Sequence, residues 1–106
     1  MKPIAFINQL CRDNGIKIKG NYPIKKHNVK GEIPETIGLY VLRDAQGREY
    51  VGKSVCMSTR IGQHRSYGTE FVTGVAIELP VDRVRLAVME EQVIRACKPE
   101  LNTKMV

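Results

Sequence analysis

The sequence predicts a small α+β domain, in which a central antiparallel sheet of three strands is flanked by helices in the order β-β-α-β-α. The chain has 106 residues, the length of one domain. Residues 37–52 have the pattern of a β-hairpin, and residues 83–97 have the apolar spacing of an amphipathic helix. Apolar residues make up 42% of the chain and charged residues 26%, which favours a folded chain over a disordered one.

The N-terminal third is expected to form a helix and then a basic arm. One stripe of a helix over residues 3–13 carries the apolar residues Ile4, Phe6, Ile7, Leu10 and Cys11. Asn14-Gly15 is a typical end for that helix. Residues 16–35 then alternate apolar with basic residues and are broken by Gly and Pro. We expect residues 1–36 to form this helix and an extended basic arm, with the option of a fourth strand in the arm. Residues 37–106 are expected to form the main unit of the same compact domain.

The remaining elements follow in order. The segments GLYVLR and REYVG are rich in Leu, Val and Tyr, and they flank a turn at residues 44–47. Ser54 is expected to cap a helix over about residues 55–66. Residues 70–79 form an apolar, β-rich third strand that Pro80 breaks. Asp82 is expected to cap a second helix over about residues 83–97, which ends ahead of Pro99.

The positive charge is concentrated in the first third of the chain. Residues 1–31 contain seven basic groups and one acid, whereas residues 32–106 contain ten of each, so the whole formal charge of +6 comes from the first segment. Such a cluster attracts a polyanion such as nucleic acid, although a merely solvated face has the same composition. The candidate nucleic-acid contacts are Lys17, Lys19, Lys25, Lys26, Lys30 and Arg65.

Other features bear on the compartment. No apolar run reaches the roughly 18 residues of a membrane span, and the N-terminal segment has polar residues too early for a signal peptide. The cysteines are odd in number, widely spaced and without a C-x-x-C pair, which disfavours a disulfide framework and a zinc knuckle. We therefore expect a cytoplasmic protein with reduced thiols and no membrane partner.

Two helices carry candidate functional residues. Arg60 and His64 are four residues apart on one helical face, where together they could bind a phosphate. In the last helix, Glu90 falls in the middle of an apolar stripe that contains Leu86, Ala87, Val93, Ile94 and Cys97. Glutamate is rarely buried unless it is paired or bound to a metal. From the residues alone, an internal Arg–Glu ion pair and an inward metal ligand are equally good interpretations.

The order of these residues resembles the GIY-YIG nuclease superfamily over about residues 37–103. Gly38-Leu39-Tyr40 and Tyr50-Val51-Gly52 correspond to its two tripeptides, with Leu39 and Val51 in place of Ile. The rest of the pattern follows in the expected order, as Lys53-Ser54, Arg60, His64, Glu90 and Asn102.

The resemblance implies a metal-dependent endonuclease that hydrolyses phosphodiester bonds in DNA. It implies that Glu90 holds Mg²⁺ or Mn²⁺, that Arg60 contacts the scissile phosphate, and that Tyr40 is the leading candidate for the general base. Tyr50 is expected close by, as a second candidate or as a residue that orients the first by a hydrogen bond. His64, whose unperturbed pKa is about 6.5, is the alternative base. Phage, mobile-element and restriction-type nucleases are all compatible, with the host cytoplasm as the location if the protein is phage-encoded. The implied supporting residues are Gly52, Lys53 and Asn102.

The pairing of the two hairpin strands decides whether the tyrosines can act together. A tight four-residue loop would place Tyr40 opposite Val51, whereas a one-residue shift or a bulge at Gly47 would bring Tyr40 and Tyr50 to one face. The catalytic interpretation expects the shift.

Two other functions are compatible with the same sequence. One is a nucleic-acid-binding module that does not cleave, in which Glu90 pairs with Arg60. The other is a small protein–protein inhibitor on the same fold. The sequence also leaves open whether the protein acts as a monomer or as a homo-oligomer.

Overall fold

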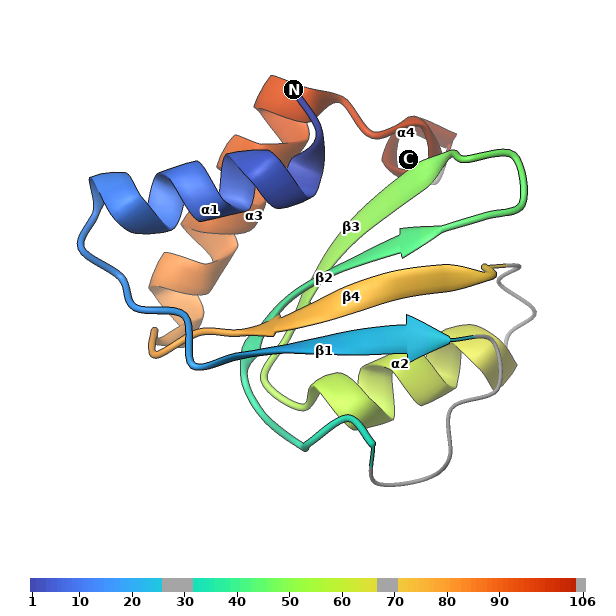
Figure 1. The fold of residues 1–106 in the computed structure, drawn as a ribbon, viewed down its shortest axis with the longest axis horizontal. Coiled ribbons are helices and arrows are strands. Elements are labelled where there is room, and N and C mark those ends of the chain that lie inside the picture. Colours follow the sequence, from blue (N-terminus) through green and yellow to red (C-terminus); the bar gives the residue numbers. More distant parts are fainter. Residues whose placement is uncertain (26–31, 67–70, 105–106) are drawn as a thin grey trace.

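The computed structural model describes residues 1–25, 32–66 and 71–104, without the side chains of residues 65, 66, 103 and 104. It is an α+β fold in which one antiparallel sheet has helices on both faces (Figure 1). Its elements are, in chain order, α1 (Pro3–Asp13), β1 (Gly20–Lys25), β2 (Gly38–Arg43), β3 (Glu49–Ser54), α2 (Met57–Ser66), β4 (Thr73–Glu78), α3 (Arg83–Cys97) and α4 (Glu100–Lys104).

The sheet has four strands in the order β1-β4-β2-β3, so the prediction of three strands is wrong by one. The additional strand is β1, which comes from the basic arm and pairs antiparallel with β4. Gly20 lies opposite Glu78 at one end of this pairing, and Lys25 lies opposite Thr73 at the other. β1 contains Pro23, and a proline is compatible with a strand only at the edge of a sheet or at a bulge. α1 packs into one hydrophobic core of the domain and β1 into the other, so the N-terminal segment is part of the same folded unit as the rest of the chain.

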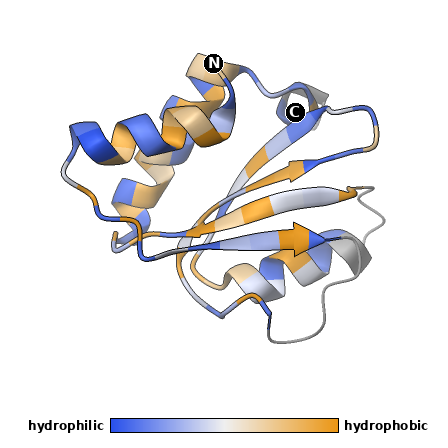
Figure 2. Ribbon diagram, viewed as in Figure 1, coloured by the Kyte–Doolittle hydropathy of each residue, from blue (hydrophilic) through white to orange (hydrophobic). Residues whose placement is uncertain are grey.

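Two hydrophobic cores form, one on each face of the sheet. α1 and α3 cover one face, and α2 covers the other (Figure 1). Figure 2 shows the amphipathic character of α1 and α3, whose hydrophobic and hydrophilic residues alternate in bands. The first core contains Ile7, Cys11, Leu39, Val41, Val51, Ile77, Leu79, Leu86, Met89 and Val93. The second contains Ile24, Ile33, Tyr40, Leu42, Met57, Ile61, Phe71 and Ala76.

The ends of the helices follow local signals in most cases. α1 and α3 have the predicted bounds, and the Asp82 carboxylate accepts a hydrogen bond from the Arg85 backbone N–H at 2.8 Å. α2 begins two residues later than expected, because β3 continues through Ser54. The Ser54 hydroxyl accepts only from the Cys56 N–H, while Glu35 takes the capping role by binding the backbone N–H and the hydroxyl of Thr59.

Three further details differ from the predictions. The strand predicted over residues 70–79 is β4, which is shorter, at Thr73–Glu78. The short helix α4 has no counterpart among the predicted elements. The buried residues of α3 are Leu86, Met89 and Val93, whereas Ala87 is exposed. The reason is a rotation of the helix: α3 turns Met89 toward the sheet, so Glu90 lies on the flank of the buried stripe rather than at its centre.

The turn between β2 and β3 sets their pairing. The Asp44 N–H bonds to the Arg48 carbonyl at 3.0 Å, and Gly47, at a φ of 80°, donates its N–H to the Asp44 carbonyl at 3.1 Å. This is a turn followed by a glycine bulge. The Asp44 side chain fixes it, accepting from the N–H groups of Gln46 and Arg48 at 2.9 Å each and from the Arg48 side chain at 2.7 Å.

The bulge shifts the register by one residue. Tyr40 lies opposite Gly52 and Leu42 opposite Tyr50, so the tight four-residue loop is excluded and the shift expected from a bulge at Gly47 is confirmed. Because side chains alternate along a strand, Tyr40 and Tyr50 both point to the α2 face. Val41 and Val51 point to the face of α1 and α3.

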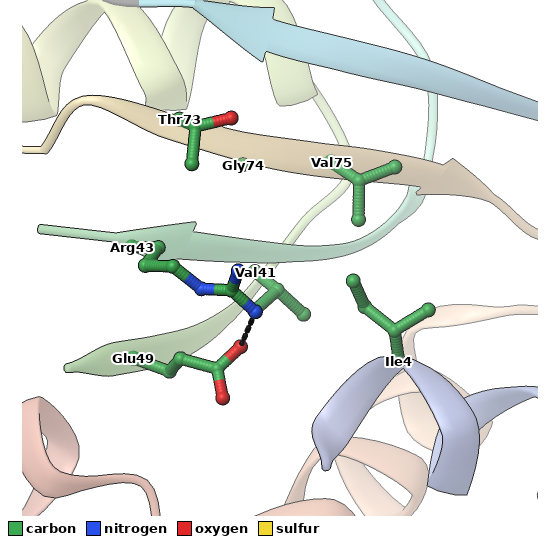
Figure 3. A pocket seen from close by; sticks show the side chains of 7 residues that line it. All are labelled: Ile4, Val41, Arg43, Glu49, Thr73, Gly74 and Val75. Carbon is green, nitrogen blue, oxygen red and sulfur yellow. Dashed lines mark hydrogen bonds and ion pairs between the residues drawn. The ribbon is translucent and has the colours of Figure 1, made fainter. Parts of the chain in front are cut away.

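A small pocket of about 100 Å³ opens on the opposite face of the sheet from the tyrosines. Val41 and Val75 line it from the sheet and Ile4 from α1, while the ion pair between Arg43 and Glu49, at 3.1 Å, borders it (Figure 3). Its volume is that of a few water molecules.

Two further findings concern the cysteines and the length of the helices. Cys11, Cys56 and Cys97 are free thiols, in agreement with the sequence. Among the described residues, no helix combines the length and the apolar character that a membrane crossing requires.

Gly38 should not tolerate a side chain. A Cβ there would lie 1.9 Å from the carbonyl oxygen of Ile77, which is backbone of the neighbouring strand. We expect Gly38→Ala to lower the free energy of unfolding by at least about 2 kcal/mol, measured by urea denaturation. The control is Gly62→Ala in α2, where a Cβ meets no atom within 4 Å. It should stabilise by up to about 1 kcal/mol, because Ala favours the helix. Equal effects would contradict the close strand approach.

Candidate functional site

Tyr40, Tyr50 and His64 form a cluster, called here the Tyr–His cluster, on the α2 face of the sheet. The Tyr40 hydroxyl and Nε2 of His64 share a hydrogen bond of 2.8 Å, and the two side chains are 1% and 4% exposed. The half-buried Tyr50 ring lies 5.2 Å from the His64 ring and 6.3 Å from the Tyr40 ring, between centroids. β2, β3 and α2 each contribute one member.

Gly52 makes room for Tyr40. The two residues are cross-strand partners, and a Cβ on Gly52 would lie 2.3 Å from Cζ of the Tyr40 ring. The hairpin predicted over residues 37–52 would end at Gly52, but β3 continues through Ser54, so Gly52 lies inside the strand. What the missing side chain admits is the ring that hydrogen-bonds His64.

The environment of Tyr40 keeps its hydroxyl protonated. Burial raises the pKa of Tyr40 most, the charges of Tyr50 and Glu90 add to the rise, and the Arg60 guanidinium opposes it through its charge and a hydrogen bond. The sum is a pKa well above its usual range, because Arg60 favours the phenolate but burial outweighs it. Around neutral pH, Tyr40 is a hydrogen-bonding phenol rather than a free base.

His64 has the opposite tendency. Burial lowers the pKa of His64, and the positive charge of Arg60 lowers it further. The imidazole is therefore neutral around neutral pH and able to accept a proton. Between Tyr40 and His64 as the general base, the surroundings favour His64.

Arg60 supplies a fixed positive charge beside this cluster. It lies one helical turn before His64 on α2, and its charge affects the pKa of both His64 and Tyr40. Its Nη1 donates to the Gln63 side chain at 3.2 Å, which steadies the guanidinium. The predicted shared face of Arg60 and His64 is thus present.

Glu90 approaches from the other side of the sheet. It belongs to α3, and its Oε1 lies 3.7 Å from Nζ of Lys53. Burial raises the pKa of Glu90, and Lys53 only partly opposes the rise. The alternative ion pair of Glu90 with Arg60 does not form, because α2 and α3 pack on opposite faces. The negative charge of Glu90 nevertheless raises the pKa of Tyr40, so Glu90 belongs to the same electrostatic environment.

These residues fit a hydrated, oxygen-preferring cation better than a chelated one. Glu90 is a single carboxylate with 21% of its side chain exposed. Across the part of the chain that the structure describes, no group of three or more His, Cys, Asp or Glu side chains gathers as a set of metal ligands. Mg²⁺ commonly keeps several waters and takes one or two carboxylates, so one half-buried glutamate is compatible with it.

Asn102 holds the outer edge of β3. Its Oδ1 accepts from the Val51 N–H at 2.7 Å, and its Nδ2 donates to the Val51 carbonyl at 2.8 Å. The side-chain amide thereby pairs with β3 as a neighbouring strand would. Through these two bonds Asn102 supports the strand that carries Tyr50, Gly52 and Lys53.

Three of the predicted nucleic-acid contacts lie on a different edge of the sheet from the strand that carries Tyr50. Lys17, Lys19 and Lys25 are exposed before or on β1, the edge of the sheet opposite β3. Lys19 also lowers the pKa of Glu78. Lys26, Lys30 and the side chain of Arg65 fall outside the described residues.

Two carboxylates with a supporting role were missed in the sequence. Glu35 binds the start of α2, and its pKa is lowered chiefly by the Thr59 hydroxyl. Glu78 lies on the same face as Tyr40 and accepts from the hydroxyls of Tyr22 at 2.9 Å and Thr36 at 2.8 Å. Each contact joins residues far apart in the chain, so no local pattern indicates it.

The candidate site has residues on both faces of β3. The Tyr–His cluster and Arg60 lie on one side of this edge strand, and Glu90 with Lys53 lies on the other. Comparisons with protein-family models, with curated proteins and with solved structures found no match. The chemistry of the chain must therefore be inferred from its own residues.

The lowered pKa of His64 predicts a pH-dependent stability. Between the folded pKa and the usual value of 6.5, the unfolded chain binds more protons. The native state is therefore destabilised as the pH falls through 6.5 toward the folded pKa. We expect the stability advantage of wild type over His64→Gln to shrink between about pH 7.5 and about pH 5, measured by urea unfolding.

NMR titration gives a direct measure of the same effect. The pKa of His64 should lie below 6.5, and Arg60→Gln should raise it. A normal or elevated pKa, with a stability difference that does not change with pH, would contradict a buried neutral imidazole.

Loss of the Asn102 amide should loosen the edge of β3. We expect Asn102→Ala to cost about 1–3 kcal/mol, because two hydrogen bonds to Val51 disappear. Exchange of the Val51 amide proton should also become faster, as measured by NMR. Asn21→Ala, on the exposed side of β1, is the control and should change stability by less than about 0.5 kcal/mol. An unchanged exchange rate at Val51 would rule out this role.

Proposed function

We propose that the protein is a divalent-metal-dependent endonuclease that hydrolyses phosphodiester bonds in DNA. The observation that carries the proposal is the register of the β2–β3 hairpin, which brings Tyr40 and Tyr50 together beside His64 and Arg60. These are the residues through which the sequence resembles GIY-YIG nucleases. A random arrangement of the hairpin would as readily have separated the tyrosines.

The proton-transfer chemistry centres on Tyr40 and His64. With His64 neutral, the Tyr40 hydroxyl donates to Nε2, and its oxygen can accept a hydrogen bond from a water molecule once binding of DNA opens the buried cluster. As that water attacks the phosphorus, Tyr40 takes the proton of the water and passes its own to His64 in one concerted movement. No free phenolate is formed, which agrees with the raised pKa of Tyr40. Tyr50, whose ring lies beside both, orients the pair.

The charged residues act on the phosphate. Arg60, permanently charged, stabilises the extra negative charge of the transition state. Glu90 would hold Mg²⁺ or Mn²⁺, and a cation bound there would supply Lewis-acid stabilisation of the phosphate oxygens. Asn102 keeps β3 in place, and Gly52 keeps the Tyr40 ring in its position.

DNA is the proposed substrate and partner. The exposed lysines of the N-terminal segment would contact its backbone, each steepening the salt dependence of binding by about one unit of logarithmic slope. We place the activity in the cytoplasm, as a phage, mobile-element or restriction-type nuclease. A homo-oligomer would place two such sites on the two strands of a duplex.

A second function follows from one specific contact. Lys53 already partners Glu90, so the glutamate can be a structural acid that needs no metal. In that case the protein is a nucleic-acid-binding module that does not cleave, with Arg60 and the lysines as backbone contacts.

Plasmid cleavage distinguishes the two functions. In Mg²⁺ or Mn²⁺ we expect wild type to nick or linearise supercoiled DNA, and EDTA should abolish the reaction. Glu90→Gln and Arg60→Gln should each lose about 100-fold or more in rate, because each removes stabilisation of the transition state. Glu91→Gln is the matched control: this neighbouring glutamate is exposed and pairs with Arg95, so its rate should not change.

Thermal denaturation of each variant checks that it remains folded. Binding of DNA without cleavage by wild type, in both metals, would establish the binding module instead. Full activity of folded Glu90→Gln would contradict the role of Glu90 as metal ligand.

A further inference from the structure

Lys53 and Glu90 form a loose ion pair at the edge of β3. The distance of 3.7 Å between Nζ and Oε1 is longer than a normal hydrogen bond, so charge attraction dominates the contact. The side chain of Lys53 is 43% exposed, and its ammonium is carried on a flexible four-carbon stem. The cation of this pair is therefore free to leave.

The negative charge of Glu90 is only weakly balanced in this ion pair. Its side chain is only 21% exposed, and the ammonium of Lys53 lies 3.7 Å from its Oε1. The adjacent Glu91, by comparison, has a close partner in Arg95 at 2.7 Å. A half-buried carboxylate with a distant monovalent partner gains by exchanging it for a divalent cation.

The position of Lys53 determines where its ammonium can go. Lys53 follows Gly52, and Gly52 is the residue beneath the Tyr40 ring. The two residues point to opposite faces of β3, an edge strand. A lysine released from Glu90 can therefore turn around this edge toward the Tyr–His cluster.

We propose that Lys53 is the resident counter-ion of Glu90, that a divalent cation displaces it, and that the released ammonium then binds a phosphate of the nucleic acid. The inference rests on the proposed function, whose metal ligand and substrate it uses. A divalent cation on the Glu90 carboxylate neutralises it and repels the nearby ammonium, so metal binding weakens the Lys53 contact and favours its release. By linkage, the metal and the nucleic acid strengthen each other's binding.

Metal binding in the absence of DNA tests the first step. Mn²⁺ is titrated into the full chain, and its affinity is read from calorimetry and from paramagnetic broadening of the amide signals near Glu90. Lys53→Met, which keeps the stem and removes the charge, should bind Mn²⁺ about two to five times more tightly, because it has no ion pair to break. Lys53→Arg and Lys17→Met should bind as wild type does, and Glu90→Gln should lose this binding.

The salt dependence of DNA binding tests the second step. Ca²⁺, which also takes oxygen ligands, replaces Mg²⁺, and a short duplex is the probe. In EDTA, wild type and Lys53→Met should have the same slope of log affinity against log salt, because Glu90 holds Lys53. In Ca²⁺ the wild-type slope should be steeper by about one unit, the contribution of one phosphate contact.

The outcomes separate this inference from the proposed function. The inference is overturned if Lys53→Met binds Mn²⁺ no more tightly than wild type, if Glu90 binds no Mn²⁺, or if the two slopes agree in Ca²⁺. Any of these results can occur while wild type still cleaves plasmid DNA. Conversely, tighter Mn²⁺ binding by Lys53→Met and divergent slopes support the exchange even if no cleavage occurs.

Discussion

The pairing of β2 with β3 is the constraint on which the rest of the site depends. A single carboxylate, Asp44, gathers the backbone of the turn, and Gly47 adopts the left-handed conformation that admits one extra residue. The extra residue sets which side chains face α2. Tyr40 then meets Gly52 across the strands, and its ring can reach His64. A local turn therefore determines contacts that join residues 24 positions apart.

The edge strand β3 organises the second half of the site. Because α2 and α3 pack on opposite faces of the sheet, Arg60 and Glu90 can approach one another only around an exposed edge. β3 provides that edge, with a glycine on one face and a lysine on the other. Glu90 is near enough to raise the pKa of Tyr40, while Arg60 opposes the rise. Opposite charges on the two sides of one strand suit a ligand such as a phosphate with its metal ion.

The sequence predicted the elements whose signals are local. The Asp82 cap, the Asn14-Gly15 end of α1 and the glycine bulge all depend on residues close together in the chain, and all three are present. For β1 the local signal is weak, because Pro23 and the basic residues interrupt the strand pattern, and pairing with β4 is what forms the strand. The Lys53–Glu90 pair and the Glu35 cap join segments far apart in the chain, so no local pattern indicates them. Ala87 is expected on the buried stripe of α3 but is exposed, because a small rotation of a helix changes which residues are buried without changing the apolar spacing.

The two hydrogen bonds from Asn102 to Val51 have a consequence for behaviour in concentrated solution. An exposed strand edge with open N–H and C=O groups is a template for pairing with another chain. At β3 the amide of Asn102, presented by α4, occupies those groups at the middle of the strand. α4 therefore acts as a barrier to self-association. A chain that has lost this short helix would keep its two hydrophobic cores but expose an aggregation-prone edge.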